Sequence, residues 1–375
     1  MDGFNFSMID LFAGAGGLSL GMEQAGFNVI FANEIDATSA YTYIKNRQLS
    51  KDRFFEGDIS VLNKELSENE FDNCFLVCGG PPCQGFSEAN RQRLIDDPRN
   101  HLYKEFLFFL KSVRPYFFIM ENVKGMVKKS PEILENFQTV LGTEYNIAAR
   151  ILNAKDFSVP QNRERFFVIG NRLGINSSRV FETAQQLPQR RFVLHDAISD
   201  LPELKPNRNR NRPDLENEEI GFREREYHYP MTEFNKFINS NRVVDRLYNH
   251  RNRYNNDRDI EIFTRLPQGG NSLDPSIEDI MPYSSRNHMF KDKYFKLVNN
   301  EICKTITSHM KFDCNMYIHP TQSRGLSPRE AARIQTFPDD YVFYGASNNW
   351  YKQIGNAVPV KLAESLGRAI KLCLK

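Results

Sequence analysis

Short apolar runs alternate with helix-length amphipathic segments from residue 5 to about residue 172. The runs are rich in β-branched and aromatic residues, as strands are. They are FSMIDLF (6–12), NVIFANE (28–34), FLVCGG (75–80), FFIMENV (117–123) and RFFVIG (165–170). Because strands that alternate with amphipathic helices are typical of a doubly wound sheet, the pattern predicts an α/β fold with a mostly parallel sheet.

This alternation is lost between about residues 173 and 315. The stretch is rich in Asn, Arg and Pro, as in KPNRNRNR (205–212), and no order of strands and helices can be followed through it. We therefore expect a catalytic domain at 1–190 that is completed by 346–375. A second, smaller and irregular domain is expected at 191–345.

Two helices are predicted near the C-terminus. In RGLSPREAARIQTFP, Ser327 is placed as N-cap, Pro328 as the first helical residue and Glu330 as the third residue of a capping box. The last segment, 358–375, has large apolar residues four positions apart, so an amphipathic helix should dock on the main domain. These residues are Leu362, Leu366 and Ile370.

The composition fits a globular protein and leaves its partner open. Of the 375 residues, 40% are hydrophobic, which is enough to bury at least one large core. The formal net charge of +2 combines many charges of both signs, so it neither requires nor excludes a polyanionic partner. Any surface for nucleic acid must therefore be local.

The cysteines and the apolar segments give expectations about compartment and metal. The six cysteines form no CxxC pair and no His/Cys array with zinc-finger spacing, so we expect neither disulfides nor a bound metal. A reducing compartment is the natural interpretation. No stretch has the apolar length of a membrane span and the N-terminus lacks a signal-like segment, so a soluble cytoplasmic protein is expected.

A glycine-rich turn follows the first predicted strand, in DLFAGAGGLSLGMEQAGF (10–27). Gly14, Gly16 and Gly17 leave backbone N–H groups bare at the start of a helix, where an anionic or polar ligand can approach closely. Ser19 stands where a dinucleotide-binding fingerprint has its third glycine. The turn therefore predicts a ligand site but weakens an NAD interpretation.

Two acidic residues end the next predicted strands. Glu34 ends the second strand and can accept hydrogen bonds from ribose hydroxyls, and Asp58 ends the third and could receive an adenine amino group. Alternatively, each carboxylate only caps a helix or turn. The pattern leaves both interpretations open.

The segment FLVCGGPPCQGFS (75–87) carries a cysteine to the edge of the predicted sheet. Its Pro-Pro pair fixes the backbone after the strand and delivers Cys83 into the crevice where such sheets bind ligands. Cys74 and Cys78 lie in or beside the apolar run and are expected to be buried structural residues. Cys83 is therefore the candidate nucleophile.

Further polar residues are expected at the same edge. Glu121 ends the strand FFIMENV, and a desolvated carboxyl there would favour the protonated form. Gln161, Arg163 and Arg165 alternate in QNRERFF, and residues two apart in a strand share a face, so all three would point into one cleft. The alternative is a solvated edge strand with ordinary surface arginines.

In this order along the chain, the motifs resemble the signature blocks of the cytosine-5 DNA methyltransferase family. The resemblance covers nearly the whole sequence except the irregular segment, and an ordered set of blocks is far more specific than any single glycine turn. The blocks are DLFAGAGG, NEID, EGDI, GGPPCQGFS, ENV, QNRER, RGLSPREAARIQTFPDDY and QIGNAVP.

The resemblance implies a Rossmann-like methyltransferase fold with S-adenosylmethionine as cofactor, and it assigns site residues. The residues implied to surround the cofactor are Phe12, Ala15, Gly16, Gly17, Glu34, Ile35, Asp58, Ile59, Pro82, Leu102 and Asn356. The residues implied to perform or support the chemistry are Cys83, Glu121, Arg163 and Arg165. The irregular segment would be the target-recognition domain, with a Thr-rich element at 305–307.

The family's mechanism explains these residue types. Cytosine carbon 5 is a weak nucleophile, and addition of the Cys83 thiolate to carbon 6 would activate it. Glu121 would donate to ring N3, and the arginines would offset the charge that develops. The base should be flipped out of the duplex, as in methyltransferases generally. The polar stretch 84–100 could be a lid, with Gln84 and Ser87 touching the DNA.

The expected partner is double-stranded DNA, bound by a monomer that is associated with chromosomal DNA and modifies a restriction site. A tRNA cytosine-5 methyltransferase would share most motifs, but this chain lacks the Cys-Phe-Thr signature usual in that branch. A catalytically silent DNA-binding relative is disfavoured by the intact Cys83, Glu121 and Arg165. An unrelated nucleotide-dependent dehydrogenase is disfavoured by Ser19.

Overall fold

The computed structural model describes the chain except for residues 1–3, 67–70, 83–101, 213, 241 and 283–292. The chain divides into two compact units. Unit 1 comprises Met1–Ser158, Arg163–Arg190 and Ala357–Lys375, and unit 2 comprises Val159–Asn162 and Arg191–Asn356.

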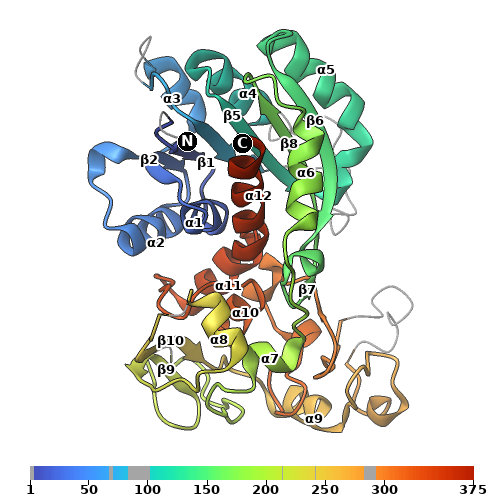
Figure 1. Cartoon of the computed structure of the whole chain (residues 1–375). Helices are drawn as coiled ribbons and strands as arrows, with labels where there is room; N and C mark the ends of the chain where they lie inside the picture. Colours follow the sequence, from blue (N-terminus) through green and yellow to red (C-terminus); the bar gives the residue numbers. More distant parts are fainter. Residues whose placement is uncertain (1–3, 67–70, 83–101, 213, 241, 283–292) are drawn as a thin grey trace. The chain divides into compact units, whose positions relative to one another are not determined.

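Unit 1 is built on a seven-stranded sheet with the order β3-β2-β1-β4-β5-β8-β6 (Figure 1). Neighbours from β3 to β5 pair in parallel, whereas β8 pairs antiparallel with both β5 and β6. The strands are β1 (Ser7–Leu11), β2 (Asn28–Glu34), β3 (Phe54–Glu56), β4 (Leu76–Gly79), β5 (Phe117–Val123), β6 (Asn146–Asn153) and β8 (Glu164–Asn171). The predicted α/β fold with a mostly parallel sheet is confirmed.

The central strands are the apolar runs of the sequence. Every residue of β1 and of β4 is buried, because helices cover both faces of the sheet. The edge strand β6 was not anticipated, and most of its residues are only half-buried. An edge strand that shares its faces with solvent has no continuous apolar run to reveal it.

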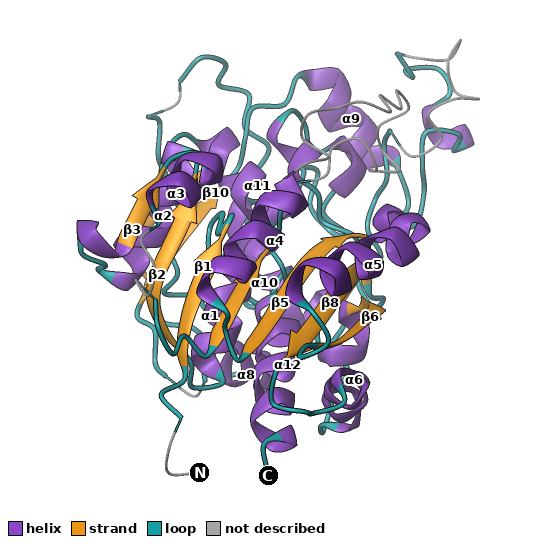
Figure 2. Ribbon diagram, turned by 90° about the horizontal axis from the view of Figure 1, so that it is seen from above, coloured by secondary structure: helices purple, strands orange, loops and turns teal. Residues whose placement is uncertain are grey.

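Helices cover both faces of the sheet (Figure 2). On one face α3, α4 and α5 pack side by side, and on the other α1, α12 and α6 do so. Their bounds, with that of α2, are α1 (Gly17–Gln24), α2 (Ala37–Arg47), α3 (Ile59–Glu65), α4 (Leu102–Val113), α5 (Ser130–Leu141), α6 (Ser177–Gln186) and α12 (Val360–Cys373). The predicted C-terminal helix is confirmed as α12, with Leu362, Leu366 and Ile370 fully buried.

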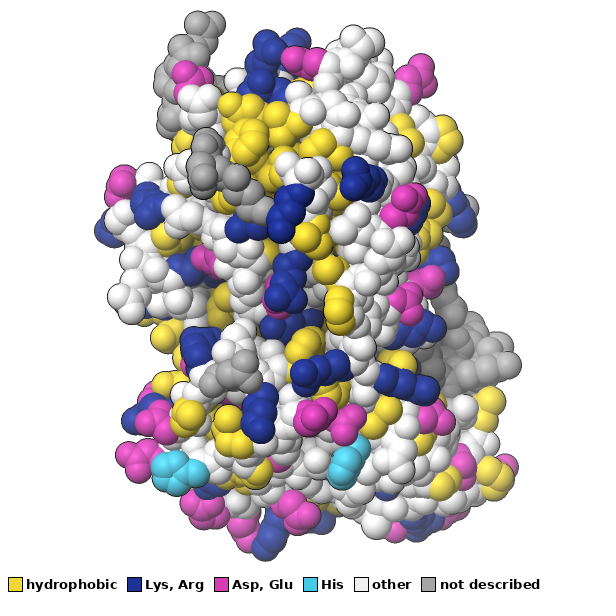
Figure 3. All heavy atoms as spheres, in the orientation of Figure 1, with side chains coloured by type: hydrophobic (Ala, Val, Ile, Leu, Met, Phe, Trp, Pro, Cys, Tyr) yellow, Lys and Arg dark blue, Asp and Glu magenta, His cyan; other side chains and the backbone are white. Residues whose placement is uncertain are grey.

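Short 3-10 helices connect several elements of unit 1. They are η1 (Lys51–Arg53), η4 (Lys124–Lys129) and η5 (Ala154–Phe157). Among the described residues, no helix is long and apolar enough to cross a membrane. On the face drawn in Figure 3, both basic and acidic side chains are exposed.

Unit 2 has little regular structure, as its sequence predicts. Two small sheets join β9 to β10 and β7 to β11. The strands are β7 (Gln161–Asn162), β9 (Gly221–Glu226), β10 (Arg246–Arg251) and β11 (Cys303–Lys304). The helices are α7 (Leu194–Ile198), α8 (Glu233–Ile238), α9 (Asp257–Arg265), η6 (Pro275–Ile277), η8 (Ser308–Lys311), η9 (Asn315–Tyr317), α10 (Pro328–Ile334) and α11 (Ser347–Asn356).

Helix α10 is held by buried ion pairs. The predicted capping box is present, because the Ser327 hydroxyl accepts from the Glu330 N–H and the Glu330 carboxylate accepts from the Ser327 N–H. Arg324 binds the same carboxylate at 2.6 Å, and Arg333 binds Asp339 at 2.7 Å. These fully buried charges are paired, which is the condition under which a folded protein tolerates them.

Candidate active site

The strand order reverses between β1 and β4. From β1 the chain moves outward to β2 and β3, and then crosses back to place β4 on the other side of β1. Loops that follow the two strands therefore diverge and leave a crevice at the carboxyl ends of the strands, where open α/β sheets bind ligands. Most of the predicted site residues of unit 1 lie in or just after the carboxyl ends of the parallel strands β1 to β5.

The glycine turn after β1 has an unusual backbone. Phe12, Gly14 and Gly16 have φ values of 53°, 54° and 79°. A bulky residue with positive φ is strained, and such strain concentrates at functional sites. A Cβ built on Gly14 would meet no atom within 4 Å, so the bare backbone there faces open space. Gly16 is the N-cap of α1, with Gly17 as its first residue.

Glu34, at the end of β2, is bonded to this turn. Its carboxylate accepts the Gly14 N–H at 2.7 Å and the Asp36 N–H at 2.8 Å. Burial raises the pKa of Glu34, and the two backbone donors oppose that effect. The next residue, Ile35, is 65% exposed although it is a large aliphatic side chain. A buried acid and an exposed apolar group thus stand together at the end of β2.

Asp58 caps α3, which is the local role that the sequence left open. Its carboxylate accepts the Ser60 N–H at 2.8 Å, while the following Ile59 is buried. A carboxylate has about four acceptor sites, so neither Asp58 nor Glu34 is saturated by these backbone bonds. Ligand binding by the two acids stays a prediction.

The turn after β4 passes beside the end of β5. A Cβ built on Gly80 would lie 3.0 Å from Glu121 Oε2, and Asn122 Nδ2 donates to the Pro81 carbonyl at 2.8 Å. Pro82 is exposed, and Leu102 is the half-buried first residue of α4. Cys83, Gln84 and Ser87 lie outside the described residues.

Glu121 and Arg165 form a buried ion pair across β5 and β8. Arg165 Nε donates to Glu121 Oε1 at 3.0 Å, and the two side chains are only 14% and 11% exposed for Arg165 and Glu121 respectively. Burial raises the pKa of Glu121 even though Arg165 and Arg163 both lower it. The carboxyl group is therefore held closer to protonation than a solvated glutamate is.

Arg163 is placed differently from Arg165. It lies between β7 and β8, and its guanidinium donates to the Ala357 carbonyl at 2.9 Å while its charge acts on Glu121. Gln161 lies in unit 2, where its amide donates to Gln335 Oε1 at 3.0 Å. The prediction of one continuous strand is wrong, because the strand is interrupted at residue 163. That the three side chains point into one cleft stays a prediction.

The remaining predicted residues lie in α11, in the glycine turn, and in or beside β4. Asn356 is the last residue of α11 in unit 2, and its side chain is exposed. Ala15 is buried in the glycine turn. Cys74 and Cys78 are buried free thiols, as predicted, and burial raises the pKa of Cys74 to about 12.

Sequence reasoning missed the contacts that fix the two turns. Asn122 was recognised only as a strand end, and nothing in its position along the chain identified the Pro81 carbonyl as its acceptor. Asp10 was also missed, although an acidic residue inside the apolar run FSMIDLF was a signal that could have found it. It is 1% exposed and belongs to a buried polar cluster behind the glycine turn.

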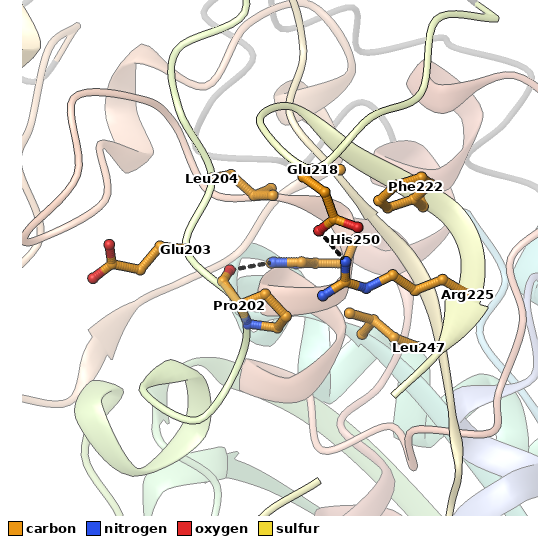
Figure 4. A pocket seen from close by; sticks show the side chains of 9 residues that line it. Pro202, Glu203, Leu204, Glu218, Phe222, Arg225, Leu247 and His250 are labelled. Carbon is orange, nitrogen blue, oxygen red and sulfur yellow. Dashed lines mark hydrogen bonds and ion pairs between the residues drawn. The ribbon is translucent and has the colours of Figure 1, made fainter. Parts of the chain in front are cut away.

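A small cavity in unit 2 contains none of the predicted site residues (Figure 4). His250 reaches its rim, with Nε2 at 2.8 Å from the Pro202 carbonyl, and Arg225 pairs there with Glu218 at 2.5 Å. Burial lowers the pKa of His250 to about 4, so the ring is neutral at pH 7. Within the described ranges, no group of three or more His, Cys, Asp or Glu side chains is arranged to hold a metal ion.

A doubly wound sheet with a glycine turn after β1 and a buried acid–guanidinium pair between β5 and β8 defines a Rossmann-like enzyme. The sequence profile of the family described as C-5 cytosine-specific DNA methylase matches residues 6–372. The chain belongs to this family and is a DNA (cytosine-5-)-methyltransferase.

Similar proteins cover the whole chain. The type II methyltransferase M.MthTI of Methanothermobacter thermautotrophicus is 34% identical over 374 residues, which are 98% of this chain and 97% of the relative. The type II methyltransferase M.FnuDI of Fusobacterium nucleatum is also 34% identical, over 97% of this chain and 94% of the relative.

Solved structures agree with the fold. A prophage-encoded protein of E. coli assigned to the DNA modification methyltransferases superposes with a TM-score of 0.76 at 26% identity. The match covers 98% of this chain and 99% of that protein.

Proposed function

We propose that this enzyme transfers a methyl group from S-adenosylmethionine to carbon 5 of a cytosine flipped out of a specific duplex DNA site, with Cys83 as covalent nucleophile. One observation carries the proposal. The buried Glu121–Arg165 pair lies beside Gly80, and the Gly80–Pro82 turn leads directly to Cys83 in the sequence.

The residues of the β1 and β2 ends fit this cofactor. Open space at Gly14 leaves room for a ligand against bare backbone. The carboxylate of Glu34 suits ribose hydroxyls, and the exposed Ile35 suits the face of an adenine ring. When bound, S-adenosylmethionine supplies an electrophilic methyl group. The full set proposed to hold it is Phe12, Ala15, Gly16, Gly17, Glu34, Ile35, Asp58, Ile59, Pro82, Leu102 and Asn356.

The other residues act on the cytosine. The Cys83 thiolate forms a bond to carbon 6, which would make carbon 5 nucleophilic toward the methyl group of the donor. Once carbon 5 has lost its proton to water, the carbon–sulfur bond to Cys83 breaks and the thiolate is released. Glu121 donates a proton or hydrogen bond to ring N3, for which its raised pKa is suited. Arg165 offsets the negative charge that develops on the ring, and Arg163 supports the same site through its charge.

The cytosine has to leave the duplex before it can react, because neighbouring bases in the stack shield carbon 6 from the thiolate. Gln84 and Ser87 are proposed to contact the DNA near the target. We assign target recognition to residues 191–345 and catalysis to 1–190 with 346–375. In the described structure, α11 (Ser347–Asn356) groups with unit 2, so the boundary between the compact units lies after residue 356 and not at residue 346 as expected.

The biological role is inferred from the relatives. Because the two relatives named above are type II methyltransferases, we propose that this chain is the modification enzyme of a restriction-modification system. It would act as a monomer on chromosomal DNA in the cytoplasm.

The test is transfer of tritiated methyl from S-adenosylmethionine to duplex DNA and, in parallel, to tRNA. We expect label in DNA only, in wild type but not in Cys83→Ser, and bisulfite sequencing of the product then gives the target site. Label that persists in Cys83→Ser overturns the nucleophile assignment. Label in tRNA alone favours the RNA-modifying alternative, and binding of DNA without label in either substrate favours a silent relative.

A further inference from the structure

A buried polar cluster packs against the glycine turn at Gly16, whereas Gly14 of the same turn faces open space. Its members come from β1, α1 and α2, namely Asp10, Ser19, Glu23, Tyr43 and Arg47. Asp10 lies two positions before Phe12 in the chain, and Arg47 is the final residue of α2. The cluster therefore ties the turn to a helix that does not adjoin it in sequence.

Arg47 is the centre of this cluster. Its Nη2 donates to the Gly16 carbonyl and to the Ser19 hydroxyl, both at 3.1 Å. Its Nε donates to Glu23 Oε2 at 2.9 Å, and the guanidinium carbon lies 3.9 Å from the centre of the Tyr43 ring. The Arg47 side chain is only 7% exposed, so these hydrogen bonds are largely shielded from solvent. Such shielding strengthens them.

Two side chains crowd the position at which a Cβ of residue 16 would project. A Cβ built on Gly16 would lie 2.6 Å from Arg47 Nη1 and 2.8 Å from a ring carbon of Tyr43. The backbone of Gly16 is thus packed directly against the guanidinium and the ring. The Arg47 guanidinium and the Tyr43 ring occupy the place that a Cβ would take, so residue 16 has to be a glycine.

The turn needs such a restraint. Three of its residues have positive φ, and one of them is Phe12, so the turn does not hold its shape through local preference alone. Arg47 binds the carbonyl of Gly16 at the N-cap of α1, while the backbone of Gly14 in the same turn faces open space. An arginine can bind several acceptors at once because its donors form a rigid fork, whereas a lysine offers a single charged point.

We propose that Arg47 is a positioning residue that fixes the glycine turn in its cofactor-binding conformation and thereby sets the affinity for S-adenosylmethionine. This inference rests on the proposed function of the turn. Arg47 does not touch the cofactor. It acts through Gly16 and Ser19, whose placement it determines.

The test is isothermal titration of the full-length enzyme with S-adenosylmethionine and with S-adenosylhomocysteine. In Arg47→Met we expect the Kd for both to rise about tenfold, which corresponds to about 1.4 kcal/mol. The KM for S-adenosylmethionine should rise in step, while the KM for DNA and kcat at saturating cofactor stay near wild type. The Kd of Arg47→Lys for S-adenosylmethionine should lie between the values of wild type and Arg47→Met.

Arg53→Met is the matched control. Like Arg47, Arg53 donates to backbone carbonyls, but its acceptors are Val29 and Ile30 in the first half of β2 and not the glycine turn. Its loss should lower stability without changing the Kd for the cofactor. An equal rise in Kd for both variants would show a general effect of destabilisation and overturn the proposal.

The remaining outcomes separate this inference from the proposed function. Wild type that binds no S-adenosylmethionine contradicts the proposed function itself. Wild type that binds it, with an unchanged Kd in folded Arg47→Met, overturns the inference alone. Where Arg47→Met does not fold, Arg47→Lys decides, because a wild-type Kd in that variant shows that the fork of donors is not needed.

Discussion

Replacing Glu121 by Gln separates the stabilising role of the Glu121–Arg165 pair from its chemical role. The two side chains meet at 3.0 Å and are 11% and 14% exposed for Glu121 and Arg165 respectively, so Glu121→Gln leaves a nearly buried guanidinium without its counter-ion. Removing one partner of a buried pair costs about 3–5 kcal/mol. Because the amide oxygen of Gln can still accept one bond, we expect a loss near the lower end, about 3 kcal/mol of the free energy of unfolding.

The second variant removes the uncompensated charge as well. Replacing a buried ion pair by neutral residues of similar volume is often neutral in stability, so Glu121→Gln combined with Arg165→Met should return to within about 1 kcal/mol of wild type. Activity should not return with it. Loss of a positioned proton donor lowers the rate by about 10²–10⁴-fold, and the double variant also lacks the guanidinium.

The assays are urea unfolding followed by circular dichroism and single-turnover methyl transfer at saturating DNA and cofactor. The reasoning is refuted if the double variant is no more stable than Glu121→Gln. The uncompensated charge of Arg165 would then not be the cause of the lost stability. It is also refuted if Glu121→Gln transfers methyl groups at the wild-type rate, because the carboxyl would then have no part in protonating the ring.

Three further predictions concern stability. Burial lowers the pKa of His250 to about 4, so the unfolded chain binds more protons below pH 6.5 and folding is weakened as pH falls. The stability difference between wild type and His250→Asn should therefore shrink by about 1.4 kcal/mol per pH unit between pH 6.5 and 4, and a constant difference in urea unfolding contradicts this. Gly21→Ala should lower stability by about 3 kcal/mol, because its Cβ would lie 2.3 Å from the Val360 carbonyl in α12; a midpoint of thermal unfolding equal to wild type would show that the helices can separate freely. Ser327→Ala should cost about 3 kcal/mol, because it removes the N-cap of α10 and the partner of His250 Nδ1 at 2.9 Å, whereas the exposed Ser276→Ala should cost less than about 0.5 kcal/mol in the same denaturation assay.

The sequence by itself determined the elements that depend on local patterns. The central strands follow from apolar runs long enough to be buried on both faces, and α12 follows from apolar residues four positions apart. The capping box at Ser327 follows from residue types three positions apart. The order of the signature blocks also gave the family, because eight motifs in one order leave few alternatives.

Only the tertiary structure decided how distant residues meet. The sequence predicted a desolvated Glu121, but the 3.0 Å contact between its carboxylate and Arg165, 44 positions away (165 − 121 = 44), cannot be read from the sequence. Gln161 and Arg163 lie two residues apart yet belong to different units, because the strand is interrupted between them. Arg47 contacts Gly16 across 31 residues. Such contacts depend on packing between elements, which local patterns do not encode.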